Sequence, residues 1–426
     1  MQPSGDSADS SAAPSSAPQA SRRMLALVLA LAFLFTLAGR GLADSYIVFQ
    51  LPLASELGLN RSETTSVYSL LMIVGALSAP MVGMLYDRHG PRVTYGLGLA
   101  LVGCGLLAAA LAHGLIVLYL GVSLLIGCGT TTLGVVSAAG LVRPWFPRRT
   151  STAMGFAFAG MGCGLLSIIP LAQFGIEHIG WRKTYFVAAA IVCALWLASQ
   201  LLLPWRRLDA ARRAMFAAGG GAKPGDATTR RAALTAALRT REFWGLAQVF
   251  FFTSVMTYVI NIQSVPYLVH SGFPAFTAAL AVGVAGALSL LGVVSAGAAA
   301  DGWNPRISAA ISYSSSFAGI GCLAALGYFP STPLLCGFVL FYGIAQGARG
   351  PLVASLSHTI FKGPASGTIF GAIYMGAPLG AAAGAMLSGV LYDLTQSFTP
   401  SFVLVIVAIM LGGSPFWSSA LRRHQK

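Results

Sequence analysis

Twelve long apolar stretches follow one another through the 426 residues of this chain. An α-helix needs about 20 mostly apolar residues to cross the hydrocarbon core of a bilayer. Only 9% of the residues are charged, whereas a soluble domain carries about 25%. A soluble fold of this length would lack the polar surface to cover its core, so the sequence predicts an all-α membrane protein. The predicted spans are residues 24–50, 63–85, 93–111, 115–141, 151–175, 184–204, 243–270, 275–300, 307–327, 334–357, 365–392 and 399–420.

The Lys and Arg residues are divided unevenly between the two sides of these spans. With the N-terminus in the cytoplasm, the cytoplasmic segments hold 21 of the 26 Lys and Arg residues and the outer loops hold only 3. Lys and Arg concentrate in the cytoplasmic loops of membrane proteins. The split therefore predicts twelve spans with both termini in the cytoplasm, because one span more or fewer would remove the asymmetry.

The spans fall into two sets of six. Residues 22–204 are predicted to form an N-terminal six-helix bundle, and residues 243–421 a C-terminal one. Between them, residues 205–242 form a basic cytoplasmic linker, interpreted as a solvated segment whose charges contact anionic headgroups. A regulatory docking site is the alternative for this linker. Residues 1–21, rich in Ser, Ala and Pro, are predicted to be a disordered cytoplasmic tail, and residues 422–426 a second tail.

The two sets of spans share a repeated pattern at an offset of 214 residues. The pattern follows the second span and recurs after the eighth. Its members are Gly83, Asp87, Pro91 and Arg92 in the first copy and Gly297, Asp301, Pro305 and Arg306 in the second. Duplicated helical halves are a recurring plan of secondary transporters, in which the substrate binds between the halves near the middle of the bilayer.

Residues 83–92 carry a resemblance to a known family. They resemble the loop signature G-x-x-x-D-[RK]-x-G-[RK]-[RK] of the major facilitator superfamily, with Pro91 at one basic position. The resemblance implies twelve transmembrane helices arranged as two six-helix bundles with pseudo-two-fold symmetry. It also implies a conformational latch, in which Asp87 pairs with a basic neighbour or with another helix. The latch residues are Asp87, Arg88, Arg92, Asp301 and Arg306. A plain positively charged loop is the alternative.

Further segments look like the monocarboxylate and oxalate/formate transporter branch of that superfamily. They are residues 49–62, 143–149 with 153–155, 180–182 and 243–244. Carriers of this branch place basic residues in their eighth helix and, in the oxalate/formate group, also in their eleventh. Here residues 275–300 and 365–392 contain no Lys or Arg. The anion-binding geometry of the branch therefore does not carry over to this chain.

Three charged residues lie deep within the apolar spans. Arg40 and Asp44 are four residues apart on one helix face, and Arg349 lies in the tenth span. Charges inside a bilayer are expensive and are candidates for function by default. We expect Arg349 to grip a carboxylate through its planar guanidinium group, and Asp44 to carry a proton that is coupled to the solute through Arg40. Purely structural roles for the Arg40–Asp44 ion pair and for Arg349 are the alternatives.

Polar side chains accompany these charges at helical spacing. Tyr342, Gln346 and Arg349 share one face of the tenth span, and Asn261 lies on a polar face of the seventh. The family resemblance implies that the first, fourth, seventh and tenth helices line a central cavity. We therefore expect Arg349, Arg40, Gln346, Asn261, Tyr342 and Tyr68 to bind the substrate.

These features predict a secondary active transporter, not an enzyme, that moves a small organic anion together with a proton. The expected setting is the inner (plasma) membrane, as a monomer in the lipid bilayer, with no cofactor, metal or nucleic acid. The sequence lacks a G-x-x-x-x-G-K-[ST] loop, so a gradient must supply the energy. An exporter of amphipathic compounds by proton antiport is the first alternative. A non-transporting sensor is the second, and it would call for a sizeable soluble domain.

Overall fold

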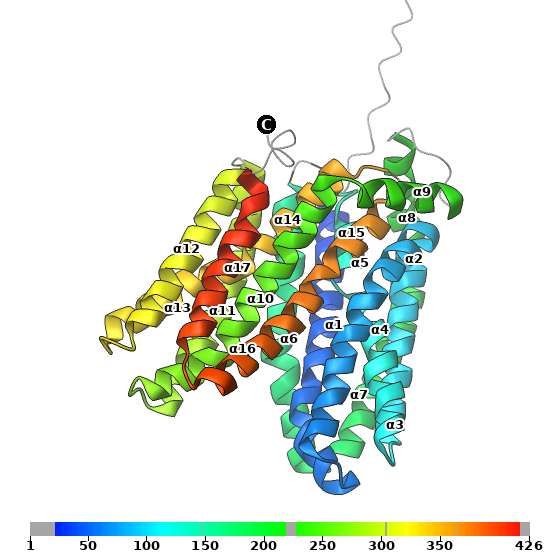
Figure 1. Cartoon of the computed structure of the whole chain (residues 1–426). Helices are drawn as coiled ribbons and strands as arrows, with labels where there is room; N and C mark the ends of the chain where they lie inside the picture. The colour runs from blue at the N-terminus through cyan, green and yellow to red at the C-terminus, as the bar shows by residue number, and fades with distance from the viewer. Residues whose placement is uncertain (1–21, 148, 219–226, 303–304, 364, 418–426) are drawn as a thin grey trace, which may run out of the picture.

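The computed structural model describes residues 22–147, 149–218, 227–302, 305–363 and 365–417. Its regular elements within these ranges are all helical, and they form two halves that lie side by side (Figure 1). The N-terminal half comprises α1 (Arg22–Leu57), α2 (Arg61–Ala110), α3 (Leu115–Leu118), the π-helix η1 (Tyr119–Ile126), α4 (Gly127–Leu133), α5 (Val135–Val142), α6 (Thr150–Ile179) and α7 (Trp181–Leu202). The C-terminal half comprises α10 (Arg241–His270), α11 (Ala275–Gly302), α12 (Pro305–Ala325), α13 (Thr332–Gly347), α14 (Arg349–Ile360), α15 (Ser366–Tyr374), α16 (Gly376–Thr395) and α17 (Thr399–Trp417).

The predicted fold of two six-helix bundles is confirmed, although several predicted spans do not correspond to one helix each. Ten described segments are long and apolar enough to cross a bilayer. One of them, α2, holds two crossings, because Gly90 adopts a φ of 79° and Pro91 follows it at the kink. Another crossing is divided at Ala348 into α13 and α14, which have 16 and 12 residues. Counting both restores the twelve predicted crossings.

The segment between the halves is more ordered than a solvated linker. It contains two short helices, α8 (Trp205–Ala218) and α9 (Ala227–Leu238). Trp205 and Leu208 of α8 are 4% and 1% exposed, and α8 packs against α2. The apolar residues of α8 thus attach it to the N-terminal half. The predicted tails, residues 1–21 and 422–426, lie outside the described residues.

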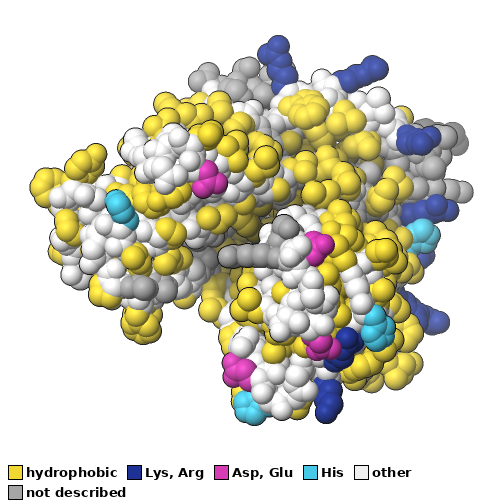
Figure 2. Space-filling model, turned by 60° about the horizontal axis from the view of Figure 1, so that its bottom comes forward, with side chains coloured by type: hydrophobic (Ala, Val, Ile, Leu, Met, Phe, Trp, Pro, Cys, Tyr) yellow, Lys and Arg dark blue, Asp and Glu magenta, His cyan; other side chains and the backbone are white. Residues whose placement is uncertain are grey.

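One end of the molecule carries the connection between the halves. Helices α8 and α9 lie at this end, where α1 also begins and α17 ends, and we call it the linker side (Figure 1). Large apolar side chains such as Met81, Leu195 and Met386 are exposed on the flanks, as expected where helices face lipid. At the opposite end the surface is hollowed between the two halves (Figure 2). The halves therefore enclose a space that is closed on one side more than on the other.

Candidate functional site

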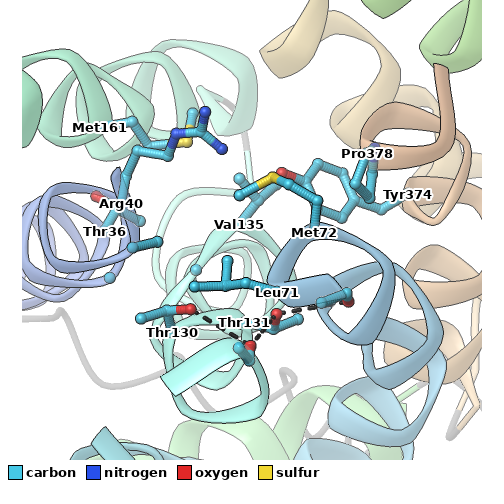
Figure 3. Close-up of a pocket in the computed structure, with 15 residues that line it drawn as sticks. Thr36, Arg40, Leu71, Met72, Thr130, Thr131, Val135, Met161, Tyr374 and Pro378 are labelled. Carbon is cyan, nitrogen blue, oxygen red and sulfur yellow. Dashed lines mark hydrogen bonds between the residues drawn. The ribbon is translucent and has the colours of Figure 1, made fainter. Parts of the chain in front are cut away.

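A cavity lies between the halves and is lined mainly by the N-terminal half (Figure 3). It encloses about 570 Å³ of empty space, its open part included. The N-terminal half contributes Thr36, Gly39, Arg40, Ala43, Leu71, Met72, Gly75, Gly127, Thr130, Thr131, Gly134, Val135 and Met161, and the C-terminal half contributes Tyr374 and Pro378. Thirteen of fifteen lining residues thus come from one half. The sequence led us to expect a more equal share from the seventh and tenth crossings.

Arg40 is the one charged side chain among the lining residues. Its Nε lies 2.6 Å from Oδ2 of Asp44, which is one helical turn further along α1. The Arg40 side chain is 31% exposed, whereas the Asp44 side chain is only 3% exposed. Tyr68 of α2 donates a hydrogen bond of 2.7 Å to Oδ1 of Asp44. The carboxylate is therefore held on both oxygens, while part of the guanidinium group faces the cavity.

Arg40 also reaches the C-terminal half. Its Nη2 donates a hydrogen bond of 2.8 Å to the hydroxyl of Tyr258 on α10. Four residues from three helices, Arg40, Asp44, Tyr68 and Tyr258, thus form one chain of hydrogen bonds beside the cavity. The i, i+4 spacing of Arg40 and Asp44 correctly predicted the first link of this chain.

Three threonines line the cavity, and each hydroxyl donates to a backbone carbonyl. Thr36 donates to Ala157 of the neighbouring α6 at 2.5 Å. Thr130 and Thr131 donate to the carbonyls of Ile126 and Gly127, each at 2.8 Å. Because their hydrogens are used in this way, the three hydroxyl oxygens are left as acceptors. They suit a water molecule or a donor group of a solute better than a second anionic group.

The predicted polar residues of α10 and α13 form a separate cluster. Asn261 accepts hydrogen bonds of 3.4 Å from Tyr342 and from Gln346. Tyr342 is 2% exposed, whereas Asn261 is exposed. None of the three is among the residues that line the cavity. The structure therefore brings the three predicted residues together, but not onto the cavity lining that includes Arg40.

Arg349 is buried inside the C-terminal half. It is 2% exposed, and its guanidinium group stacks on the ring of Tyr313 at 4.1 Å. Its Nη2 donates to the carbonyl of Ser312 at 3.1 Å and to the hydroxyl of Ser316. These partners belong to α12, and Nη1 also contacts Sδ of Met256 on α10 at 3.7 Å. Arg349 is thus held within its own half and is not among the residues that line the cavity. A grip on a carboxylate would require Arg349 to leave α12.

Asp87 joins the two halves on the linker side. Its carboxylate accepts hydrogen bonds from the backbone N–H groups of Gly367 at 3.1 Å and Thr368 at 2.7 Å. It also accepts one of 2.9 Å from the Thr368 hydroxyl. These groups lie in the first turn of α15, where a negative charge is favoured by the unpaired N–H groups and by the helix dipole. Asp87 thus pairs with a neighbouring helix, one of the partners that the sequence suggested.

The other predicted latch residues lie differently. Arg88 is exposed, and Arg92 donates to Gln200 of α7 at 3.2 Å, within its own half. The side chain of Asp301 lies outside the described residues, and Arg306 is half-buried at the start of α12. A basic residue that was not predicted, Arg143, donates to Ser366 at 3.2 Å across the halves. Burial lowers the pKa of Arg143, and the nearby charge of Asp87 opposes that effect.

Four glycines let the halves approach closely on the linker side. A Cβ added at Gly83 would lie 2.1 Å from the carbonyl oxygen of Gly367, and one at Gly371 would lie 2.3 Å from that of Ala79. In the symmetry-related contact, a Cβ at Gly297 would lie 2.4 Å from the oxygen of Ser151. One at Gly155 would lie 2.6 Å from that of Val293. The repeat at an offset of 214, which pairs Gly83 with Gly297, therefore marks two equivalent crossings, α2 with α15 and α6 with α11.

Several residues of the site were missed from the sequence. Tyr258 and Tyr374 were not predicted, because a tyrosine in an apolar span is as common in packing as in binding. Thr130 and Thr131 belong to a run of three threonines within an apolar span, a signal that could have been read as a polar face. In Figure 3 the Tyr374 ring and the Arg40 side chain approach the cavity from opposite sides.

Comparisons with known proteins agree with this architecture. The Major Facilitator Superfamily profile matches residues 29–329. Monocarboxylate transporter 11 of Mus musculus is 29% identical over 340 residues, which cover 77% of this chain and 72% of that protein. The oxalate:formate antiporter of Oxalobacter formigenes is 25% identical over 241 residues, which cover 56% of this chain and 54% of that protein.

Solved structures agree in fold. The fucose:proton symporter of E. coli superposes with a TM-score of 0.72 at 14% identity, covering 94% of this chain and 99% of that one. A proton:xylose symporter superposes with a TM-score of 0.69, also at 14% identity, covering 93% of this chain and 95% of that one. At this identity the likeness concerns the fold alone.

Proposed function

Because the chain belongs to the major facilitator superfamily, we propose that it is a secondary carrier that moves a small monocarboxylate-like anion, together with a proton, by alternating access. One observation carries the proposal: Arg40 is the one charged side chain that lines the cavity, and it is 31% exposed there. A guanidinium group binds a carboxylate through two parallel N–H groups. The names of the monocarboxylate and oxalate:formate relatives favour the same class of solute.

The charge balance of the site favours coupling to one proton. Arg40 and Asp44 together are neutral, so a bound monocarboxylate would leave one negative charge between the halves. Carrying an uncompensated charge through a low-dielectric region is costly. Protonation of Asp44 would remove that charge and release the Arg40 Nε, which now binds Asp44, towards the solute.

Replacing Asp44 with Asn tests this coupling. In proteoliposomes with an inward proton gradient, we expect Asp44→Asn to lose accumulation of acetate, propionate or butyrate above equilibrium. Exchange of internal for external carboxylate should continue, because exchange does not require release of the proton. Glu63→Gln, at a half-buried acidic residue in the first turn of α2, is the matched control. Proton-driven accumulation in Asp44→Asn equal to that of the unaltered protein would contradict the role of Asp44.

The remaining predicted residues enter the proposal in different ways. Tyr68 positions Asp44 through its hydrogen bond of 2.7 Å. Asn261, Tyr342 and Gln346 would orient a solute as it approaches from the hollowed end. Arg349 would contact the solute only in a conformation in which its hydrogen bonds to α12 are broken. In the present conformation, Arg40 is the residue that would bind the anion.

We also propose an orientation and a latch. The linker side is assigned to the cytoplasm of a plasma membrane, in agreement with the excess of Lys and Arg in the segments expected there. Residues 22–204 and 243–421 then act as the two moving bundles of a monomer. Asp87 is the principal latch residue, since it holds α15 of the opposite half by three hydrogen bonds. Arg88, Arg92, Asp301 and Arg306 would act as its partners in other steps of the cycle.

Replacing Asp87 with Asn should weaken the latch with little change in shape. The neutral amide loses the charge that the first turn of α15 stabilises, and hydrogen bonds to a charged group contribute about 1.5–3 kcal/mol. We expect the population open on the linker side to rise about tenfold or more. The measurement is the labelling rate of Thr131→Cys in the cavity, in a cysteine-free background, by an impermeant reagent applied from that side. An unchanged rate would exclude the latch, and Asp393→Asn on α16 is the control.

A further inference from the structure

Tyr258 connects the C-terminal half to the charged group of the cavity. Its hydroxyl oxygen accepts a hydrogen bond of 2.8 Å from Nη2 of Arg40, which lies 218 residues earlier in the chain. The side chain is half-buried on α10. Because Arg40 belongs to α1 and Tyr258 to α10, this bond crosses between the halves beside the space where a solute would bind.

The hydrogen-bond donors around Arg40 are only partly used. The Nε is taken by Asp44 and one Nη2 hydrogen by Tyr258. Both oxygens of Asp44 already have a partner, because Tyr68 donates to its Oδ1 while Arg40 holds its Oδ2. Tyr258 uses its oxygen as an acceptor, and its hydroxyl hydrogen has no acceptor among the described residues. A guanidinium group has five N–H donors, so the Nη1 donors of Arg40 and the Tyr258 O–H lie next to each other without a shared acceptor.

The surroundings favour an anion as that acceptor. Among the fifteen lining residues there is no Asp or Glu, and the threonine hydroxyls already donate to backbone carbonyls. Apart from Arg40, the threonines and Tyr374, the lining side chains are apolar, such as Met72 and Met161. A buried or half-buried donor without a partner costs free energy, which a ligand with two adjacent oxygens would recover. A carboxylate has this geometry, whereas its primary amide offers one acceptor oxygen and an NH2 group that donates.

We propose that Tyr258 is a substrate-binding residue that clamps the carboxylate together with Arg40. This clamp rests on the carrier function proposed above. One carboxylate oxygen accepts from Nη1 of Arg40, and the other accepts from the Tyr258 hydroxyl. The bound anion then joins α1 of one half to α10 of the other. The requirement for two acceptor oxygens selects carboxylates over neutral solutes of the same shape. The anion would add a second connection between the halves to the direct Arg40–Tyr258 bond.

Tyr258→Phe tests the clamp, because it removes the hydroxyl and keeps the ring. The probes are acetate, propionate and butyrate, each beside its amide, binding to the purified full-length protein. A hydrogen bond to a charged group is lost, so carboxylate affinity should fall about 10- to 100-fold. Tyr267→Phe is the matched control: it lies on the same helix, and its hydroxyl donates at 2.8 Å to the carbonyl of Ala324 within its own half. The thermal midpoint of Tyr258→Phe should stay close to that of this control.

A double-mutant cycle separates direct binding from a merely structural role. In Arg40→Lys the paired donors are lost, so adding Tyr258→Phe should cost much less than it does in the unaltered protein. Equal carboxylate affinity in Tyr258→Phe and Tyr267→Phe would overturn the clamp and leave the carrier function intact. Failure of the unaltered protein to bind any carboxylate in preference to its amide would overturn the proposed substrate class, and the clamp with it.

Discussion

Carboxylate uptake is expected to fall about 100-fold or more when Arg40 is replaced by Ala. The substitution removes the one charged side chain that lines the cavity. It also leaves Asp44, 3% exposed, without its cation, and breaking a buried ion pair costs about 3–5 kcal/mol. The measurement is the initial rate of uptake of the three short carboxylates into proteoliposomes at a fixed proton gradient.

Two further variants separate binding from folding in this experiment. Arg40→Lys keeps the charge but loses the planar fork, so it should retain part of the uptake. The pair Arg40→Met with Asp44→Asn removes both charges, so the fold should be stable although uptake stays lost. Recovery of uptake in this neutral pair would contradict the assignment of Arg40 to the anion. It would instead support the alternative that Arg40 and Asp44 form a purely structural ion pair.

Transport is also expected to stop when Gly83 is replaced by Leu, for a reason unrelated to charge. A Cβ at Gly83 would lie 2.1 Å from the carbonyl oxygen of Gly367 and 2.8 Å from Cα of Thr368. These atoms belong to the opposite half, so each half can still fold while the halves cannot close on the linker side. The variant should therefore be trapped open on that side. The labelling rate of Thr131→Cys by an impermeant reagent from the linker side should rise about tenfold or more.

Gly389→Leu is the matched control for the closure experiment. It places the same side chain on helix α16, where a Cβ would have no heavy atom within 4 Å. Gly389→Leu should therefore transport and label like the unaltered protein. If Gly83→Leu behaved in the same way, the close contact of α2 with α15 could not be part of the transport cycle.

The crossings were predictable because each depends on local information. A run of about 20 apolar residues has few alternatives to a membrane helix, and an even count of crossings was required by the division of Lys and Arg. The repeat at an offset of 214 predicted that Gly83 and Gly297 have equivalent places. The break at Ala348 was not predicted, although Gly347, Gly350 and Pro351 lie close to that position and such residues weaken or end helices.

The site was less predictable, because its contacts join distant segments. The pairing of Arg40 with Asp44 follows from their spacing on one helix, and a charge in an apolar span draws attention by itself. Which face of a helix meets the cavity depends on how the halves pack. That packing depends on contacts between residues far apart in the sequence, so no local pattern predicts it. Arg349 illustrates the difference: it was identified by its charge, but the Tyr313 ring and Ser312 carbonyl that surround it were not. Tyr258 was missed because its partner lies 218 residues away.

The glycine crossings on the linker side also bear on leakage. Attraction between packed atoms loses about a quarter to a half of its strength over a gap of about 0.5–1 Å, so even a small opening weakens a contact of backbone against backbone. Such a surface is either in contact or apart, as expected for packed elements that switch between two states. A closed crossing of this kind leaves no room for a file of water molecules along which protons could pass. Close packing of the backbones would then prevent proton leakage between transport cycles, without a separate segment that blocks the pathway.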